Sequence, residues 1–177
     1  MNTLRAIANW KTNTVIFVVY LILSTIAFPY HANNIRKQTG EITRTLDMRF
    51  SYAVEEVEAL FLKLKPEGRA EYHFVERVTD IAYPIVYGIL MILLITNLTT
   101  FLKLKIWWVL FPVLTMIFDF AENATILRLL DQYPTLHTST VRLASSFSSM
   151  KWCFVVFSVS TIIGLSILRF KRKKQTD

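Results

Sequence analysis

The sequence predicts an all-α integral membrane protein: a four-transmembrane-helix bundle with an amphipathic helical outer loop, forming one membrane domain over residues 1–177. Of its 177 residues, 53% are hydrophobic and the mean hydropathy is +0.40, which exceeds what a soluble domain of this length needs for a core. The apolar residues also gather into four stretches close to the roughly 20 residues that cross a bilayer as a helix. These stretches are 14–30, 81–102, 106–127 and 152–170.

The first stretch, 14–30, follows a basic start and could be mistaken for a secretory signal. A signal peptide ends in a small-x-small cleavage site, whereas Pro29, Tyr30 and His31 follow here. We therefore expect an uncleaved membrane anchor.

Residues 31–80 connect the first two spans and carry a helical pattern. In 41–64 the apolar residues recur at three- and four-residue steps, which predicts an amphipathic helix with Thr39 as its N-cap. The motif "KPEG" at 65–68 is expected to end this helix and to start another that runs into the second span. The connection could form a lid or a docking face, or simply lie on the membrane. The apolar positions are Ile42, Leu46, Phe50, Val54, Val57, Leu60, Phe61 and Leu64.

The turn "KLK" at 103–105 joins the second and third spans and forces an antiparallel hairpin. Four spans place both termini on one side, where Arg5, Lys11 and the "RFKRKK" segment add basic charge. The positive-inside rule then predicts cytoplasmic termini in a plasma or inner membrane. The connection 31–80 also holds eight basic residues, but these are mixed with nine acidic ones. We expect the basic C-terminal tail, 171–177, to contact anionic lipid.

The third span contains acids where lipid is expected. Asp119, Glu122 and Asn123 are spaced i, i+3, i+4, so they share one side of the helix, and the stripe extends back through Thr115 and Pro112. One aspartate at the centre of a membrane helix costs roughly 2.5 to 3.5 kcal/mol on the insertion scale. We therefore expect this face to be hidden from lipid, in a polar pocket in the outer half of the bilayer.

A second polar stripe, on the second span, runs in the opposite direction. Counting the helical rise from the "KLK" turn brings Tyr87 level with Asp119, and Tyr83 level with Glu122. Lys151 opens the fourth span at the same end, and the small residues of 144–150 predict a packing seam. The second stripe consists of Glu76, Asp80, Tyr83, Pro84 and Tyr87. The candidate ligand-binding residues are thus Asp119, Glu122, Asn123, Asp80, Tyr83, Tyr87 and Lys151.

Several functions fit this polar pocket. Our leading hypothesis is a membrane protein that binds a ligand or organises a partner there. The first alternative is a small enzyme acting on a lipid or isoprenoid, with Asp119 and Glu122 as the candidate catalytic acid and base. The second is an oligomeric proton or cation transporter. A network that merely clamps the helices together is the non-functional interpretation. The sequence assigns no cofactor and leaves enzymatic activity undecided.

A metal site is predicted only weakly, from His73, Glu76 and Asp80 on one helical flank. The single cysteine, Cys153, gives no disulfide framework or thiol metal cluster. There is no phosphate loop, nucleophile elbow or dinucleotide fingerprint. The basic tail has no interleaved aromatic residues, so nucleic acid is not expected as a partner. The expected partners are membrane lipids and either a second copy of this chain or another membrane protein.

The order of a long first outer loop, a short inner turn and a shorter second outer loop resembles that of claudin-like tetraspan proteins. The tryptophan-rich motif and paired loop cysteines of that family have no counterpart here. No residue role is therefore transferred.

Overall fold

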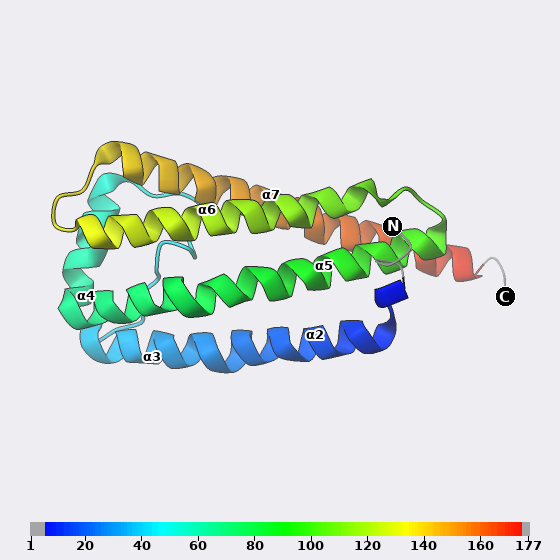
Figure 1. Ribbon diagram of the computed structural model, residues 1–177, viewed down its shortest axis with the longest axis horizontal. Helices are drawn as coiled ribbons and strands as arrows, with labels where there is room; N and C mark the ends of the chain where they lie inside the picture. Colours follow the sequence, from blue (N-terminus) through cyan, green and yellow to red (C-terminus); the bar gives the residue numbers. More distant parts are fainter. Residues whose placement is uncertain (1–5, 175–177) are drawn as a thin grey trace.

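The computed structural model describes residues 6–174, and this part of the chain is almost entirely helical, with no strand. Arg5 and residues 175–177 of the predicted basic tail lie outside the described residues. Within them, four helical stretches are long and apolar enough to cross a membrane. They lie side by side and alternate in direction (Figure 1).

The elements in chain order are α2 (Trp10–Ile22), η1 (Leu23–Ala27), α3 (Phe28–Thr39), α4 (Val54–Phe74), η2 (Val75–Thr79), α5 (Asp80–Leu102), η3 (Ile106–Val109), α6 (Leu110–Gln132) and α7 (Thr138–Lys174). Helix α2 begins, and α7 ends, at the same end of the bundle as the turn between α5 and α6 (Figure 1). We call this the KLK end, after residues 103–105. The opposite end, where α4 lies, is called the α4 end.

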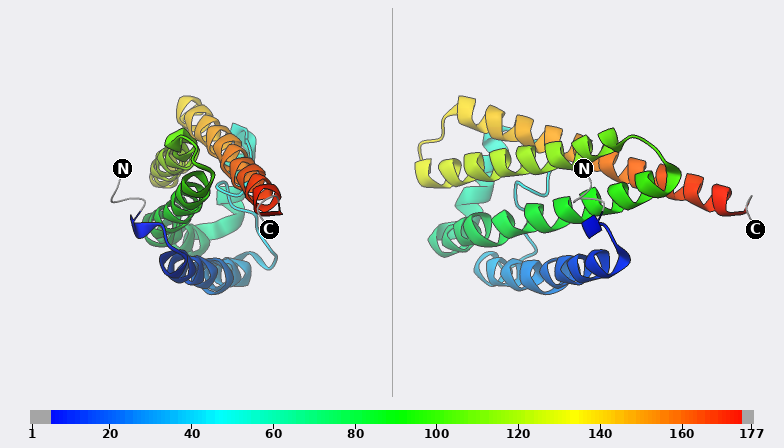
Figure 2. Two further views of the ribbon diagram at one scale, coloured as in Figure 1. Left: turned by 90° about the vertical axis from the view of Figure 1, so that its right-hand side faces the viewer. Right: turned by 45° about the vertical axis from the view of Figure 1, so that its right-hand side comes forward.

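The first helical stretch lies at the edge of the bundle. Helix α2 has no buried residue, and it continues through the wider π-helical turn η1 into α3. It packs against α5 through aromatic rings, with Tyr20 stacked on Tyr83 at 5.7 Å between ring centroids. Figure 2 shows α2 and α3 beside α5 in both views. At the α4 end, Gly40 takes the left-handed conformation (φ 81°) and ends α3.

The segment 41–53 is not helical, so the prediction of one amphipathic helix through 41–64 was wrong over this part. Thr39 is the last residue of α3 and not an N-cap. Helix α4 begins at Val54, where the side chain of Glu56 accepts a hydrogen bond from the backbone of Ala53 at 2.8 Å.

Tertiary contacts explain why 41–53 leaves the helical conformation. Ser148 and Ser149 of α7 donate hydrogen bonds to the carbonyls of Arg49 and Phe50, at 2.5 and 2.9 Å. The backbone N–H of Tyr52 in turn donates to Ser145 at 2.9 Å. Backbone groups that a helix would pair internally are therefore satisfied by α7. The small-residue stretch 144–150 thus packs against this loop.

Helices α4 and α5 form one long, bent path. Lys65 has non-helical angles (φ 56°, ψ 177°) directly before Pro66, which agrees with the break expected at "KPEG". After Phe74 the backbone widens into the π-helical turn η2, and Asp80 then begins α5. The turn that ends α5 has Lys103 in the left-handed conformation (φ 57°).

The apolar core is divided between the two ends. Tyr72, Phe61, Leu46 and Leu129 belong to a large buried cluster at the α4 end, which joins α3, α4, α6, α7 and the loop. A smaller cluster at the KLK end consists of Ile95, Leu98, Leu102 and Leu165. The polar stripes described above lie between these clusters along α5 and α6.

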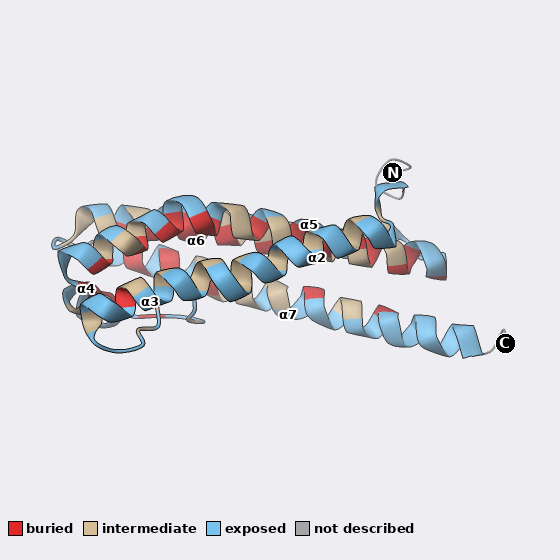
Figure 3. Ribbon diagram, turned by 90° about the horizontal axis from the view of Figure 1, so that it is seen from below, coloured by how far each residue is buried: buried red, intermediate tan, exposed pale blue. Residues whose placement is uncertain are grey.

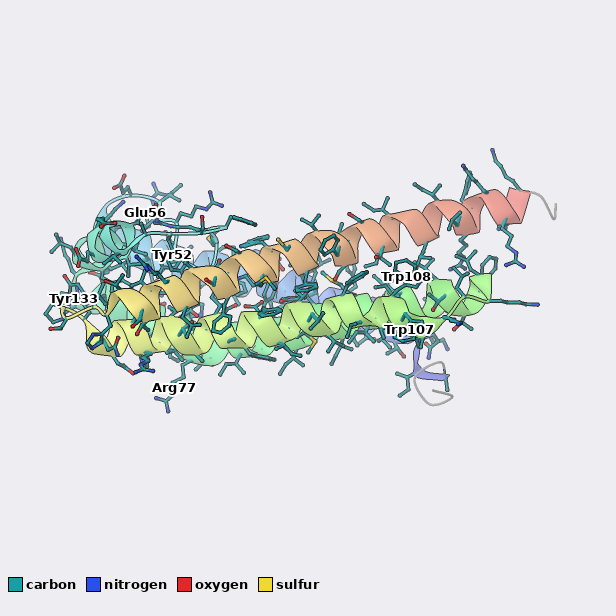
Figure 4. The ribbon with its side chains drawn as sticks, turned by 90° about the horizontal axis from the view of Figure 1, so that it is seen from above. Tyr52, Glu56, Arg77, Trp107, Trp108 and Tyr133 are labelled. Carbon is teal, nitrogen blue, oxygen red and sulfur yellow. The ribbon has the colours of Figure 1, made fainter. Side chains whose placement is uncertain are left out.

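Outside the core, apolar side chains cover much of the surface. Figure 3 shows buried residues along α5 and α6, whereas the last turns of α7 are exposed. Examples are Ile163, Ile167 and Phe170, each more than half exposed. Figure 4 places Tyr52 at the α4 end and the paired Trp107 and Trp108 near the KLK end.

Candidate functional site

Helix α6 presents one continuous polar face to the interior. Asp119 is 4% exposed and Glu122 is fully buried, and Asn123, Thr115 and Pro112 are buried beside them. This arrangement follows from the three- and four-residue spacing of these positions, which aligns them on one side of a helix. The predicted concealment of this face is confirmed.

Lys151 of α7 is the cation at the centre of the site. Its Nζ lies 2.5 Å from Glu122 Oε2 and 3.7 Å from Asp119 Oδ1. It also donates a hydrogen bond to the carbonyl oxygen of Asp47 at 2.9 Å. An ammonium group has three N–H donors, and three oxygen atoms of other residues lie around this one. Lys151 itself is 6% exposed.

Tyr87 of α5 reaches Asp119 as its helical level predicted. The phenol Oη donates to Asp119 Oδ2 at 2.5 Å. The parallel prediction for Tyr83 was wrong, because this ring turns toward the first helical stretch, where Ser24 of η1 donates to its hydroxyl at 3.4 Å. It also packs edge-to-face on Phe28, with 4.9 Å between ring centroids. Glu122 finds its partner in Lys151.

A second acidic group lies beside the first. One carboxylate oxygen from each of Asp47, Glu76 and Asp80 can be chosen so that all three lie within 4.8 Å of one another. Glu76 lies in the π-helical turn η2 and Asp80 directly follows it. A turn closed by i→i+5 hydrogen bonds places residues four apart on nearly the same side. Both carboxyls therefore face the interior.

Asp47 comes from the irregular loop, and sequence analysis missed it. It fell on the polar side of the predicted amphipathic helix. Its Oδ1 accepts a hydrogen bond from Tyr72 Oη at 3.2 Å, and the same phenol oxygen accepts one from the backbone N–H of Leu46 at 3.1 Å. Tyr72 is 1% exposed, so it holds the loop carboxyl against η2 from within the core. The fully buried Leu46 next in sequence fixes the loop at this point.

Asn123 links α6 to α5 at the same level. Pro84 has no N–H, so the carbonyl of Asp80, four residues earlier, loses its helical donor. The side-chain amide of Asn123 donates to this carbonyl at 2.6 Å. A predicted ligand-binding residue thus serves partly to satisfy a backbone group that a proline exposes.

Tyr52 closes the site on the loop side. Burial raises the pKa of its phenol above the ordinary value, and the nearby carboxyls of Glu122, Glu76 and Asp47 raise it further. The hydroxyl is therefore protonated at neutral pH. Its Oη is buried and has no hydrogen-bond partner among the described residues.

His73 does not join the acidic group, so the predicted set of His73, Glu76 and Asp80 is corrected. Its Nε2 lies 3.3 Å from Asp131 Oδ1 near the surface of the bundle. The widening at η2 separates His73 from the inward-facing side that Glu76 and Asp80 share. The group of possible metal ligands contains Asp47 in its place.

The site carries more negative than positive groups. Two groups of carboxyls lie in this region with a single buried lysine, Lys151: Asp119 and Glu122 contact it directly, and Asp47, Glu76 and Asp80 form the second group. Among the described residues, the ion pairs of Lys151 go to Asp119 and Glu122, and no ion pair reaches the carboxyl of Asp47, Glu76 or Asp80. Both oxygens of Glu76 are buried, and neither has a hydrogen-bond partner in the described part of the chain.

Two open grooves lie outside this site. The first is lined by Arg44, Met48, Phe50 and residues of α7 from Trp152 to Phe157, and the second lies between α4 and the 133–134 turn. Neither is lined by any of the five carboxyl residues.

Comparison with protein-family models, with curated proteins and with solved structures gives no match to this chain.

Proposed function

We propose that this protein is a multi-pass membrane protein whose buried acidic site binds a cationic ligand. Support for the membrane comes first from the four long apolar helical stretches. Helix α2 has no buried residue, and α7 exposes Ile163, Ile167 and Phe170. Such surfaces are stable in an apolar solvent and are a liability in water.

Charge supports an orientation. Lys103 and Lys105 form the turn at the KLK end, and α7 finishes there with Lys171 to Lys174. The positive-inside rule then favours a cytoplasmic KLK end. In this orientation the acidic site lies in the outer half of the bilayer and the loop 41–53 covers it from outside.

The charge imbalance is the observation that carries the proposal. The ammonium of Lys151 is surrounded by Glu122, Asp119 and the carbonyl of Asp47. Three further carboxyls remain without a cation. Burying an ionised carboxylate without a counter-charge is very unfavourable, so these groups either take up protons or bind a positive ligand. A cationic ligand satisfies the carboxyls and the unpartnered oxygens of Glu76 together.

Native mass spectrometry of the protein, released gently into a mild detergent, tests this function. We expect a bound metal ion, amine or aminolipid on the natural chain, and its loss from the Glu76→Gln, Asp80→Asn double variant. Glu55→Gln, Glu58→Gln is the matched control, because both residues are exposed on α4. Two results together would contradict the proposal. The protein would retain no ligand, and its melting temperature would not change with calcium, magnesium, spermidine or phosphatidylethanolamine.

An acid–base enzyme is the second candidate, and a different set of contacts favours it. Tyr87, Asp119 and Lys151 form a continuous chain that ends on Glu122. A proton could be exchanged between two such carboxyls if a lipid reached them. If Asp119→Asn and Glu122→Gln keep the fold and the bound ligand but stop conversion of a membrane lipid, the enzyme replaces the binding protein. If they lower only stability, the network is a structural clamp.

Transport gains less support from the contacts. A path for protons or cations would have to continue from Asp119 toward the KLK end. The next buried hydroxyls on that side, Thr115 and Ser158, donate to the carbonyls of Phe111 and Phe154 in their own helices. The two hydroxyls also lie 3.4 Å from each other between α6 and α7, but neither carries a charge, so transport by one chain has less support than binding.

A further inference from the structure

We propose that the carboxyl groups of Asp47, Glu76 and Asp80 form a binding site for one calcium ion. The inference rests on the proposed function, because it names the cation that the acidic site takes. The three residues come from the loop, from η2 and from the start of α5, so an ion held between them would tie the loop to the bundle.

The spacing of the oxygens suits calcium. One oxygen from each residue lies within 4.8 Å of the other two. Calcium binds oxygen at about 2.3 to 2.6 Å, so two of its ligands lie at most about 5.2 Å apart, and one ion can reach all three oxygens. Magnesium usually keeps several waters and is held by one or two carboxylates, so a set of three protein carboxylates favours calcium. A purely carboxylate set also favours a hard cation over zinc or copper.

Glu76 supplies an independent observation. It is fully buried, and neither of its carboxylate oxygens has a hydrogen-bond partner within residues 6–174. Native proteins rarely leave a buried polar group unsatisfied, and an ionised carboxylate without a counter-charge is costly at a buried position. Lys151 is already surrounded by oxygens of Glu122, Asp119 and Asp47. A metal ion would satisfy Glu76 where no protein donor does.

The surrounding residues suit an ion that enters from the loop. Asp47 is partly exposed, whereas Glu76 and Asp80 are buried, so Asp47 offers the entrance. Tyr72 donates to Asp47 and orients its carboxyl, as second-sphere groups commonly do. Asn123 Oδ1 is buried and unpartnered, while its amide holds the Asp80 carbonyl, so it stands nearby as a further oxygen donor.

Thermal unfolding of the full-length protein in detergent, with calcium chloride or with EGTA, tests the site. Binding to the folded state alone raises the melting temperature by about 5 to 10 °C at a hundredfold excess over Kd. We expect Glu76→Gln to abolish this rise. Without calcium, Glu76→Gln should melt no lower than the natural chain, because it removes an unpaired buried acid. Glu58→Gln, an exposed substitution of the same kind, should keep the full rise.

Terbium(III), which resembles calcium in size, gives a second readout through luminescence sensitised by Tyr72, whose hydroxyl contacts Asp47. Calcium should compete with terbium in the natural chain, and Asp80→Asn should weaken terbium binding at least tenfold. An equal response to magnesium, or a calcium rise that survives in Glu76→Gln, would overturn the assignment. If spermidine or an aminolipid binds and calcium does not, the calcium site fails while the cation-binding function stands; if nothing binds, both fail.

Discussion

The two halves of the bundle bury polar side chains in opposite ways. Toward the KLK end the buried groups are hydroxyls that donate to their own helix: Thr99 to the carbonyl of Ile95 at 2.8 Å, and Thr96 to that of Ile92 at 2.7 Å. Toward the α4 end the buried groups are mainly acids whose partners come from other segments. There Lys151 of α7 meets Glu122 of α6 and the carbonyl of loop residue Asp47.

The difference separates polar residues that a helix satisfies locally from those that need the assembled fold. A threonine bonded within its own turn keeps its partner even when helices move apart. A buried carboxylate loses its partner as soon as the neighbouring element leaves, and then costs several kcal/mol. Four predictions test this contrast, in order of decreasing effect. Each effect is measured by equilibrium unfolding in detergent except where stated.

Lys151→Met should have the largest effect. It removes the ammonium that contacts Glu122 and Asp119, and leaving a buried charge without its partner costs about 3 to 5 kcal/mol. Lys171→Met, at an exposed position near the end of α7, serves as the control and should change stability by less than about 0.5 kcal/mol. Equal stability of the two variants would mean that the acids near Lys151 are already neutral.

Tyr87→Phe should come next, because it removes the donor to Asp119 Oδ2. Hydrogen bonds to charged groups contribute about 1.5 to 3 kcal/mol. A double-mutant cycle with Asp119→Asn isolates the pair, and its coupling energy should fall in this range. Tyr30→Phe, at a ring 63% exposed, is the matched control. A coupling energy near zero would show that the phenol and carboxyl do not interact.

Ser148→Ala should loosen the loop and leave the bundle intact. Ser148 donates to the carbonyl of Arg49, and one such bond contributes about 1 kcal/mol. Trypsin should therefore cut after Arg44 or Arg49 about fivefold faster, as followed by mass spectrometry of the fragments. Ser146→Ala is the control, since its hydroxyl donates to Arg142 of its own helix. Equal cleavage rates would contradict the role of the α7 serines.

Thr99→Val should have the smallest effect, below about 0.5 kcal/mol, because the hydroxyl donates only within its helix. Thr79→Val at the α4 end is the matched case. Its hydroxyl lies 3.2 Å from His31 Nε2 of another helix, so this substitution should cost about 1 kcal/mol. If Thr99→Val proves the more damaging, the contrast between the two ends is wrong.

Helical period predicted much of the candidate site. The spacing of Asp119, Glu122 and Asn123 required a single face, and the cost of exposing acids to lipid required that face to turn inward. Counting the helical rise from the turn at 103–105 then paired Tyr87 with Asp119. These predictions succeeded because they depend on local geometry that a regular helix fixes.

Other parts of the site depend on breaks in that regularity. The loop 41–53 shows a helical pattern, yet α7 serines satisfy its backbone, and this brings Asp47 to Glu76. The π-helical turn η2 shifts the register after Phe74, which leaves His73 near Asp131. Neither feature has a residue signature that pattern analysis detects. Tyr83 was misassigned because helical level does not specify which neighbouring helix a ring faces.

The contact that joins Asn123 to the Asp80 carbonyl next to Pro84 has a consequence for how the hairpin of α5 and α6 assembles. Pro84 leaves the carbonyl of Asp80 without its helical donor, and the side chain of Asn123 on α6 supplies the donor instead. Sliding one helix past the other by one turn would leave this carbonyl oxygen without a hydrogen-bond donor. This hydrogen bond therefore fixes the register of α5 against α6. A substitution at residue 123 that removes the amide should allow the two helices to pack in other registers.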